Sequence, residues 1–559
     1  MTKRTSRRWG ETVRRGVVWL VLLTSATGFS QGEWEQWFRD PPPGYRPEVY
    51  WDWMGGLISR EGITKDLEAL EHAGVGGVLI MQMPDQLQWM IEPYFLLNHD
   101  WRTAAARAHL AGSEFWMGGP QLIGPAPDSA ALYDQKVVWA EAFTSESWES
   151  AWRNDPWRMK PFGDAAFCRG INHLVMHGFT HNPWDDRFQP GVTMGLWGTQ
   201  IEELWGQPGH PGEEKRQGRI IADQPIASAL DRLVEGPDFV CQPLYIPLFA
   251  QEPVITPRLL YRHRRSGQTD IYFLSNQEDR PLEIRADFRV AGKQPELWDP
   301  GDGAARLLRD FHPQGKRTLI PLRLEPRQSF FVVFRLPTAA SPRAERPNIP
   351  VLRQEFQLTG AWEVGFDPKR GGPERVTFDA LADWTQRAEP GIQYYSGAAT
   401  YQKEFDLPPN GGAGSRLFLD LGTVRNLAQV QLNGQDLGVV WCAPWRVQIS
   451  GGVKPLGNRL ATTVINTWAN RLIGDEVEPE DCELVPWNPP ERKGGYAMDV
   501  PGRGLRDLPD WLLTGAARPS SHRYTFNTWR YYPKGAPLLP SGLLGPVTIL
   551  GEGESAEHK

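Results

Sequence analysis

Glu141 is the residue whose surroundings best suit a catalytic carboxylate. It follows the apolar run from Val137 to Ala140 and precedes Ala142 and Phe143. This pattern predicts a place near the carboxyl end of a buried strand, where barrel enzymes hold their catalytic groups. A carboxylate partly shielded from water suits a general base or acid. The alternative is a structural carboxylate that pairs with a neighbouring cation or caps the next helix.

A second group of polar and aromatic side chains follows a predicted strand over residues 174–179. Two imidazoles, an indole and two acids gather there: His177, His181, Trp184, Asp185 and Asp186. Such side chains hydrogen-bond sugar hydroxyls and stack on sugar rings, so His177, His181, Trp184 and Asp185 are predicted to bind substrate. A metal role for the two histidines is weaker, because Pro183 breaks the helix that a zinc-protease pair requires.

Asp52 lies between Trp51 and Trp53 at the end of the first predicted strand. Asp52 and Trp53 are therefore further candidates for substrate contact. The alternative is a pair of buried indoles beside a capping Asp. Asp52 and Asp85 are also the candidates for a second carboxylate that faces Glu141. Because the sequence has no Gly-rich phosphate loop and no GxSxG turn, it does not support phosphoryl or acyl transfer.

The elements that must position these residues alternate between helix and buried strand. Residues 59–74 begin with the capping residue Ser59 and carry apolar residues at helical spacing, which predicts an amphipathic helix. Runs without polar alternation predict strands of a parallel sheet over residues 76–81, 137–140 and 174–179. Two more helices are predicted, one over residues 100–111 and one capped by Asp164. This order is typical of a (β/α) barrel.

Short alternating strands replace this pattern beyond about residue 255. They predict a small β-sandwich over residues 255–336 and, after a proline-rich linker at 337–349, a C-terminal jelly-roll β-sandwich over 350–552. Asn433-Gly434 supplies a hairpin turn in the second sandwich. The predicted fold class is therefore multidomain, α/β plus all-β, with a tail at 553–559.

Composition limits the class of partner. The 559 residues carry 60 basic and 67 acidic side chains, a formal charge of −7, which argues against nucleic-acid binding. The 25 tryptophans suit flat sugar faces, although many belong to cores. Four scattered cysteines exclude a disulfide scaffold and a zinc ribbon.

The first 30 residues read as a signal peptide. A basic start precedes the apolar run 17–23, which is too short to span a bilayer, and small residues at Gly28 and Ser30 suit cleavage after Ser30. The protein is predicted to be secreted or periplasmic, with no membrane span after cleavage.

Several blocks of this sequence resemble glycoside hydrolase family 106, the secreted bacterial α-L-rhamnosidases. They begin with Tyr50-Trp-Asp-Trp-Met54 and continue with residues 61–68, 73–77, Ala140-Glu-Ala-Phe-Thr144 and residues 177–184. The C-terminal blocks, which include residues 395–401 and 466–475, are similar to the sugar-binding, galactose-binding-like sandwich of those enzymes. The resemblance implies inverting hydrolysis by two carboxylates, with Glu141 as general base, a carbohydrate partner and a Ca²⁺ ion.

The sequence departs from the family pattern in the segment where the general acid would lie. Only about sixteen residues separate Pro120 from Val137, whereas one βα unit needs roughly 30. Residues 31–254 are therefore predicted to form a shortened, incomplete (β/α) barrel. Two hypotheses follow: an exported glycoside hydrolase of O-glycosidic bonds, or a degenerate carbohydrate-binding relative that lacks the general acid. A second carboxylate facing Glu141 would distinguish them.

Overall fold

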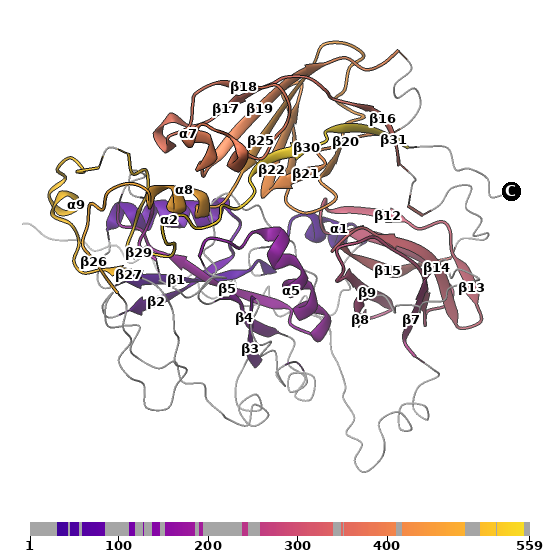
Figure 1. The fold of residues 1–559 in the computed structure, drawn as a ribbon. Helices are drawn as coiled ribbons and strands as arrows, with labels where there is room; N and C mark the ends of the chain where they lie inside the picture. Colours follow the sequence, from indigo (N-terminus) through magenta and orange to yellow (C-terminus); the bar gives the residue numbers. More distant parts are fainter. Residues whose placement is uncertain are drawn as a thin grey trace, which may run out of the picture.

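The computed structural model of the chain contains three units, a mixed α/β unit and two β-sandwiches (Figure 1). It describes residues 31–42, 45–54, 59–83, 111–117, 127, 137–145, 151–184, 189–193, 237–243, 258–338, 348–349, 352–409, 416–486, 503–520 and 522–552. Asp85, Asp185, Asp186, the signal peptide and the helix predicted over residues 100–111 lie outside these residues.

The α/β unit is built on a parallel sheet in the order β2-β1-β5-β4-β3. Its strands are β1 (Glu48–Met54), β2 (Gly77–Met83), β3 (Ala111–Trp116), β4 (Val138–Thr144) and β5 (His173–Thr180). β5, the last of these five strands along the chain, pairs with β1, the first, as in a barrel. β2 and β3 form the two edges of the described sheet. The segment between residues 120 and 137, where the sequence predicts the shortening, lies between β3 and β4, which pair directly. No described strand joins β2 to β3, and the shortened, incomplete barrel stays a prediction.

Helices α2 (Arg60–His72) and α5 (Pro156–Arg169) contribute to the apolar core of this sheet. Ser59 caps α2 as predicted, its hydroxyl accepting from the Gly62 amide at 3.0 Å. The cap of α5 is Asp155 rather than Asp164, which lies inside the helix and pairs with Lys160. Leu70 and Met159 from the helices pack in one core with Ala140, Ala142 and Leu174 from the strands.

The middle unit packs two antiparallel sheets around an apolar core. One sheet holds β13 (His312–Gln314), β14 (Arg317–Leu324), β10 (Leu282–Phe288) and β7 (Phe239–Pro243). The other holds β12 (Ala304–Leu307), β11 (Lys293–Asp299), β15 (Ser329–Pro337), β9 (Thr269–Asn276) and β8 (Leu259–Ser266). Because β7 pairs with β10, this sandwich begins before the boundary predicted at residue 255.

The C-terminal unit also packs two antiparallel sheets around a core. One contains β16 (Leu352–Gln357), β31 (Thr548–Glu552), β20 (Leu417–Asp420) and β24 (Arg446–Gln448). The other contains β18 (Val376–Phe378), β17 (Trp362–Gly365), β19 (Ala398–Phe405), β25 (Asn458–Ile465), β22 (Leu427–Leu432) and β23 (Gln435–Val440). The predicted Asn433-Gly434 turn joins β22 to β23, with φ of 54° and 83° that suit Asn and Gly. The jelly-roll connectivity stays a prediction.

Short elements complete the described chain. Helix α1 (Gln31–Arg39) precedes the sheet, and β21 (Thr423–Arg425) pairs with β30 (Gly542–Gly545). The remaining helices are η5 (Pro368–Arg370), η6 (Trp384–Gln386), α7 (Pro390–Gln393), α8 (Ala469–Asp475) and α9 (Asp510–Thr514). A small sheet joins β26 (Leu484–Pro486), β27 (Arg503–Leu505) and β29 (Trp529–Arg530), while β28 (Phe526–Asn527) pairs with β6 (Pro190–Gly191).

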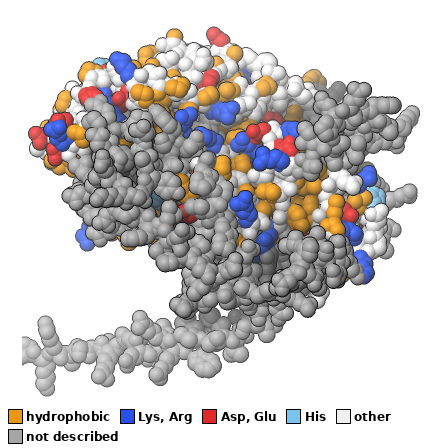
Figure 2. Space-filling model, turned by 60° about the horizontal axis from the view of Figure 1, so that its bottom comes forward, with side chains coloured by type: hydrophobic (Ala, Val, Ile, Leu, Met, Phe, Trp, Pro, Cys, Tyr) orange, Lys and Arg blue, Asp and Glu red, His pale blue; other side chains and the backbone are white. Residues whose placement is uncertain are grey.

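The described surface mixes side-chain types. On the face drawn in Figure 2, apolar side chains reach the surface between scattered basic and acidic ones. No helix among the described residues is long and apolar enough to cross a membrane. All four cysteines are free thiols, so no disulfide bond links the three units.

Candidate active site

The two faces of the parallel sheet differ in chemistry. Side chains alternate along a strand, so Ala140 and Ala142 face the helices while Glu141 faces the other side. Register places Glu114 of β3 opposite Glu141, and Asp52 of β1 opposite Thr180 of β5. Together with His177, these residues form a polar face, which is the candidate active site.

Glu141 is held in place by a neighbour on its own strand. The Thr144 hydroxyl donates to Glu141 Oε1 at 2.6 Å, and 19% of the Glu141 side chain is exposed. Residues three apart in a regular strand point to opposite faces, but Phe143 has a φ of 63° and is the extra residue of a bulge against β3. The bulge returns Thr144 to the face of Glu141, so the carboxylate is both oriented and reachable.

His177 is a buried neighbour of Glu141. Its Nδ1 lies 3.9 Å from Glu141 Oε1, beyond hydrogen-bond distance, and has no hydrogen-bond partner. Burial lowers the pKa of the imidazole, although the charge of Glu141 opposes this shift. A neutral ring with an unpartnered nitrogen is suited to bind a substrate hydroxyl.

Asp52 is a fully buried carboxyl group. Neither of its side-chain oxygens has a hydrogen-bond partner. Burial, and then the charge of Glu141, raise the pKa of Asp52 well above its usual range. Gly178 leaves room for this side chain, because a Cβ there would lie 2.9 Å from Asp52 Oδ2. Asp52 is thus a carboxyl group that tends to keep its proton, which is what a general acid requires.

Glu114 is a polar-face residue that sequence reasoning did not single out. Burial, and then the charge of Glu141, raise its pKa, while a hydrogen bond from Trp116 lowers it. Only the pairing of β3 with β4 places this glutamate beside Glu141. It is a third carboxyl group of the polar face.

The separation of the carboxyl groups follows from strand order. Asp52 and Glu141 stand on β1 and β4, with β5 between them. Register also offsets them along the sheet, because Asp52 pairs with Thr180 of β5 whereas Glu141 pairs with Val175. They are close enough for the charge of Glu141 to raise the pKa of Asp52. Glu114 is directly in register with Glu141 on the next strand, and a spacing of about 4.8 Å between neighbouring strands is shorter than the roughly 6.5–9.5 Å between the carboxyl groups of inverting glycosidases.

The other predicted binding residues lie in packed environments. His181 is fully buried, and its Nδ1 contacts Asp66 Oδ2 at 2.6 Å while Nε2 accepts from the Ser59 amide at 3.3 Å. Trp53 lies beside that ring, with centroids 6.2 Å apart. Trp184 packs edge-on against Phe526 at 5.2 Å. These three side chains fix the ends of β1 and β5 rather than joining the carboxyl groups.

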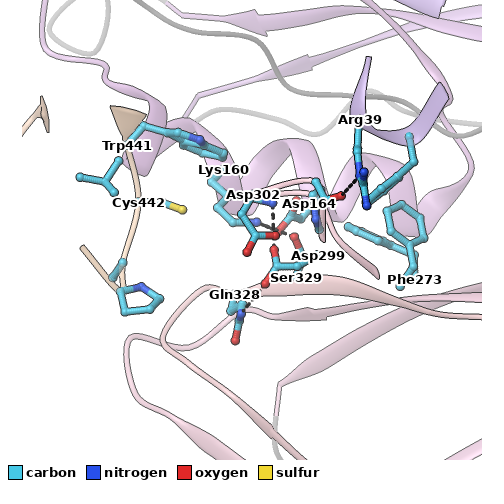
Figure 3. Close-up of a pocket in the computed structure, with 18 of the residues that line it drawn as sticks. Arg39, Lys160, Asp164, Phe273, Asp299, Asp302, Gln328, Ser329, Trp441 and Cys442 are labelled. Carbon is cyan, nitrogen blue, oxygen red and sulfur yellow. Dashed lines mark hydrogen bonds and ion pairs between the residues drawn. The ribbon is translucent and has the colours of Figure 1, made fainter. Parts of the chain in front are cut away.

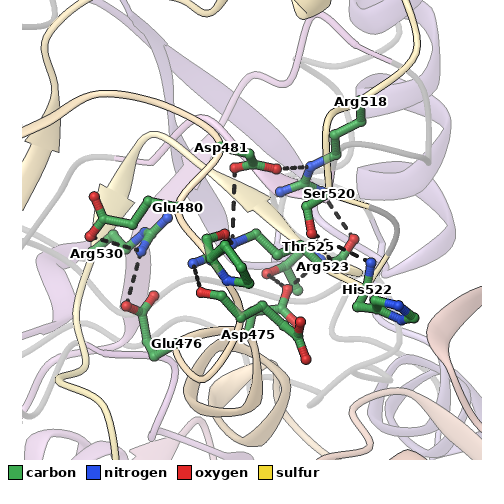
Figure 4. A network of polar contacts seen from close by, with 12 residues as sticks. Asp475, Glu476, Glu480, Asp481, Arg518, Ser520, His522, Arg523, Thr525 and Arg530 are labelled. Atoms are coloured by element: carbon green, nitrogen blue, oxygen red, sulfur yellow. Dashed lines mark hydrogen bonds and ion pairs between the residues drawn. The ribbon is translucent and has the colours of Figure 1, made fainter.

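A buried ionic network anchors the C-terminal segment beside these strand ends (Figure 4). Asp475 Oδ2 accepts from the Thr525 amide and hydroxyl at 2.7 and 2.6 Å, and Arg518 pairs with Asp481 at 2.5 Å. From this anchor, β28 pairs with β6 just after β5. The C-terminal unit thereby supports the loop that follows His177.

The five strands of the parallel sheet bring no Lys or Arg to the polar face, and the described residues form no metal cluster. None of the strands β1 to β5 contains a Lys or Arg. No three His, Cys, Asp or Glu side chains in the described residues come together closely enough to hold a metal ion. The calcium ion implied by the resemblance stays a prediction.

Comparisons place this geometry among carbohydrate-active proteins. The α-L-rhamnosidase model of glycoside hydrolase family 106 matches residues 39–113, 123–207 and 200–311. The structure of a rhamnosidase from Novosphingobium sp. PP1Y has a TM-score of 0.64 and 25% identity, covering 87% of this chain and 55% of that one.

A curated relative carries a different name. A provisionally assigned β-glucuronidase of Formosa agariphila is 40% identical over 203 residues, 36% of this chain and 16% of the relative. The chain therefore spans about half the length of the rhamnosidase and under a fifth of this relative.

Proposed function

The chain is a relative of the α-L-rhamnosidases of glycoside hydrolase family 106, and from this premise we propose that it hydrolyses the O-glycosidic bonds of rhamnose-containing glycosides or polysaccharides. The observation that carries the proposal is the pair Asp52 and Glu141 on one face of the parallel sheet, two strands apart. Inverting hydrolysis needs two carboxyl groups that flank the glycosidic bond, one protonated and one ionised.

Each carboxyl group has the environment its role requires. Glu141 is partly exposed and oriented by Thr144, so it acts as the base that takes a proton from the attacking water. Asp52 is buried and unpartnered, with a raised pKa, so it acts as the acid that protonates the departing oxygen. His177 binds a hydroxyl of the sugar between them.

The charge of the site favours a neutral sugar over a glucuronide. A uronate needs a cation for its carboxylate, and strands β1 to β5 supply four carboxyl groups, those of Glu48, Asp52, Glu114 and Glu141, and no Lys or Arg. Bringing a second carboxylate to this face adds repulsion without a counterion. A rhamnoside carries hydroxyl and methyl groups only, so it avoids that cost.

The alternative function is carbohydrate binding without cleavage. Asp52 is completely buried in this structure, and the chain covers only 55% of the rhamnosidase chain. A protein that cannot bring its acid to the glycosidic oxygen would still bind the sugar through Glu141 and His177.

Assays on aryl α-L-rhamnosides and aryl β-glucuronides test the proposal. Wild type should cleave the rhamnoside, and Glu141→Gln should lower kcat by about 10² to 10⁴, the usual share of general acid-base catalysis. Glu404→Gln is the matched control, since Glu404 is an exposed glutamate of the C-terminal sandwich that pairs with Arg459. Rhamnoside binding without turnover in wild type would favour the binding alternative, and equal activity in wild type and Glu141→Gln would refute the role of Glu141.

Two further parts of the proposal concern export and the C-terminal unit. We propose that residues 1–30 are removed on secretion or transfer to the periplasm, which N-terminal sequencing of exported protein would test by a start near Gln31. We also propose that the C-terminal sandwich is a sugar-binding jelly roll. The isolated residues 350–552 should then melt cooperatively and bind saccharide.

A further inference from the structure

A cavity of about 850 Å³ lies where the three units meet (Figure 3). Helix α5 forms one wall, the middle sandwich forms a second through β9, β11 and β15, and residues 437–448 of the C-terminal unit form the third. The volume is within the range of about 300–1,000 Å³ typical of small-molecule sites.

The cavity is separate from the carboxyl groups of the polar face. Met159 and Ala166 of α5 pack in the core that holds Ala140 of β4, whereas Lys160 and Asp164 of the same helix line the cavity. Glu141 points away from that core. A ligand in the cavity would therefore lie on the opposite side of the sheet from Glu141.

Hydrogen bonds hold the polar side chains of the cavity in fixed positions. Lys160 Nζ donates to Asp164 Oδ2 at 2.7 Å and to the Ser329 hydroxyl at 2.5 Å. Asp299 accepts from the Gly301 amide at 2.8 Å and from Gln328 Nε2 at 3.2 Å. Each Asp299 oxygen keeps lone pairs for a ligand, and Lys160 keeps a third N–H. Such an arrangement is preorganised, which reduces the cost of binding.

Aromatic side chains stand on two sides of these polar groups. Figure 3 shows Trp441 of the C-terminal unit at one end and Phe273 of β9 at the other, with Asp164, Asp299 and Ser329 between them. An aromatic face beside fixed hydrogen-bonding groups is the combination that recognises a sugar ring.

The lining charges indicate what kind of ligand fits. Five basic and three acidic side chains line it: Arg39, Lys160, Arg262, Arg264, Arg446, Asp164, Asp299 and Asp302. Lys160 is already paired with Asp164, and Arg446 with Asp420. Donors and acceptors are therefore both present around the cavity, which suits hydroxyl groups because each of them both donates and accepts. We propose that this cavity is a second saccharide site, which binds an uncharged sugar between Trp441 and Asp299 without cleaving it.

Binding measurements on the full chain test this site. Ligand-observed NMR with L-rhamnose, D-galactose and D-galacturonate should show an uncharged sugar binding to Glu141→Gln protein, and the affinity should fall about tenfold or more when Trp441→Ala is added. Gln328→Ala is a second variant of the cavity, which keeps the test valid if Trp441→Ala lowers the melting temperature. Tyr261→Ala removes an exposed aromatic outside the cavity and should bind like the parent.

The outcomes separate this site from the proposed catalysis. Sugar binding that depends on Trp441 in a protein without rhamnosidase activity would sustain the second site and refute only the catalytic proposal. Binding that is unaffected by both Trp441→Ala and Gln328→Ala, or binding of D-galacturonate alone, would overturn the second site. So would the absence of binding by all three sugars.

Discussion

The hydroxyl of Thr144 donates a 2.6 Å hydrogen bond to Oε1 of Glu141, although the two residues are three apart in one strand. The bulge at Phe143, with its φ of 63°, makes this contact possible. Backbone in this region is uncommon for a residue with a large side chain, and such strain is found at functional sites. The contact ties the direction of the proposed base to the local backbone.

Removing the Thr144 hydroxyl should weaken catalysis without unfolding the protein. Hydrogen bonds to charged groups contribute about 1.5–3 kcal/mol, so Thr144→Val should lower kcat/KM by about tenfold or more. Thr462→Val is the matched control, because Thr462 is buried in β25 of the C-terminal sandwich and its hydroxyl has no partner. Equal losses in the two variants would contradict a specific role for Thr144.

Asp52→Asn should change how stability depends on pH. Burial raises the folded-state pKa of Asp52 above its unfolded value, near 3.9. The contribution of Asp52 to stability is therefore fully present below about pH 4 and is lost as pH rises through the folded-state pKa. Asn cannot ionise, so the melting temperature of Asp52→Asn should increase relative to that of wild type as pH rises from about 4 towards 7. A constant difference across that range would show that Asp52 is not perturbed.

Asp52→Asn also tests the acid role through the leaving group. A good leaving group departs without a proton, so the variant should lose much more activity on alkyl rhamnosides than on nitrophenyl rhamnosides. Steady-state kinetics on both substrates measure the difference. Similar losses on the two substrates would assign Asp52 to another role.

His181→Gln should act on stability rather than on sugar contact. The ring donates to Asp66 at 2.6 Å and accepts from the Ser59 amide. Its loss leaves a buried carboxylate that still accepts from the Trp51 indole. We expect a loss of about 1–3 kcal/mol in the free energy of unfolding, measured by urea denaturation. KM at a temperature where the variant is folded should change little. A large rise in KM with unchanged stability would place His181 at the substrate.

Lys160→Met should loosen the contact between α5 and the middle sandwich. The side chains of Lys160 and Asp164 are 8% and 9% exposed, and removing one partner of a buried pair costs about 3–5 kcal/mol. Calorimetry should show a lower melting temperature. The control Arg459→Met breaks an ion pair with Glu404 that is 80% and 74% exposed, and it should melt close to wild type. Equal melting temperatures of the two variants would mean that the buried ion pair does not stabilise the protein.

The predictions from sequence succeeded where the signal was local. Ser59 precedes a helical apolar pattern and caps α2, and Asn433-Gly434 forms the turn between β22 and β23. Both depend on residues within a few positions of one another. Asp164 failed as a cap because Asp155, followed by Pro156, provides the stronger start for the same helix.

The sequence by itself determined the buried strands and the presence of Asp52 and Glu141 in them, although Glu141 lies at the middle of β4 and not at the carboxyl end that the apolar run predicted. Only the tertiary structure decided which of these strands are neighbours, because pairing depends on contacts between residues far apart in the chain. Pairing brings Glu114 beside Glu141 and separates Glu141 from Asp52 by one strand. The tertiary structure also separates His181 from the polar face, because its ring hydrogen-bonds to Asp66 on α2, 115 positions away in the chain. The apolar pattern of one strand predicts which of its residues are buried. The distance between two carboxyl groups depends instead on the order of the strands in the whole sheet.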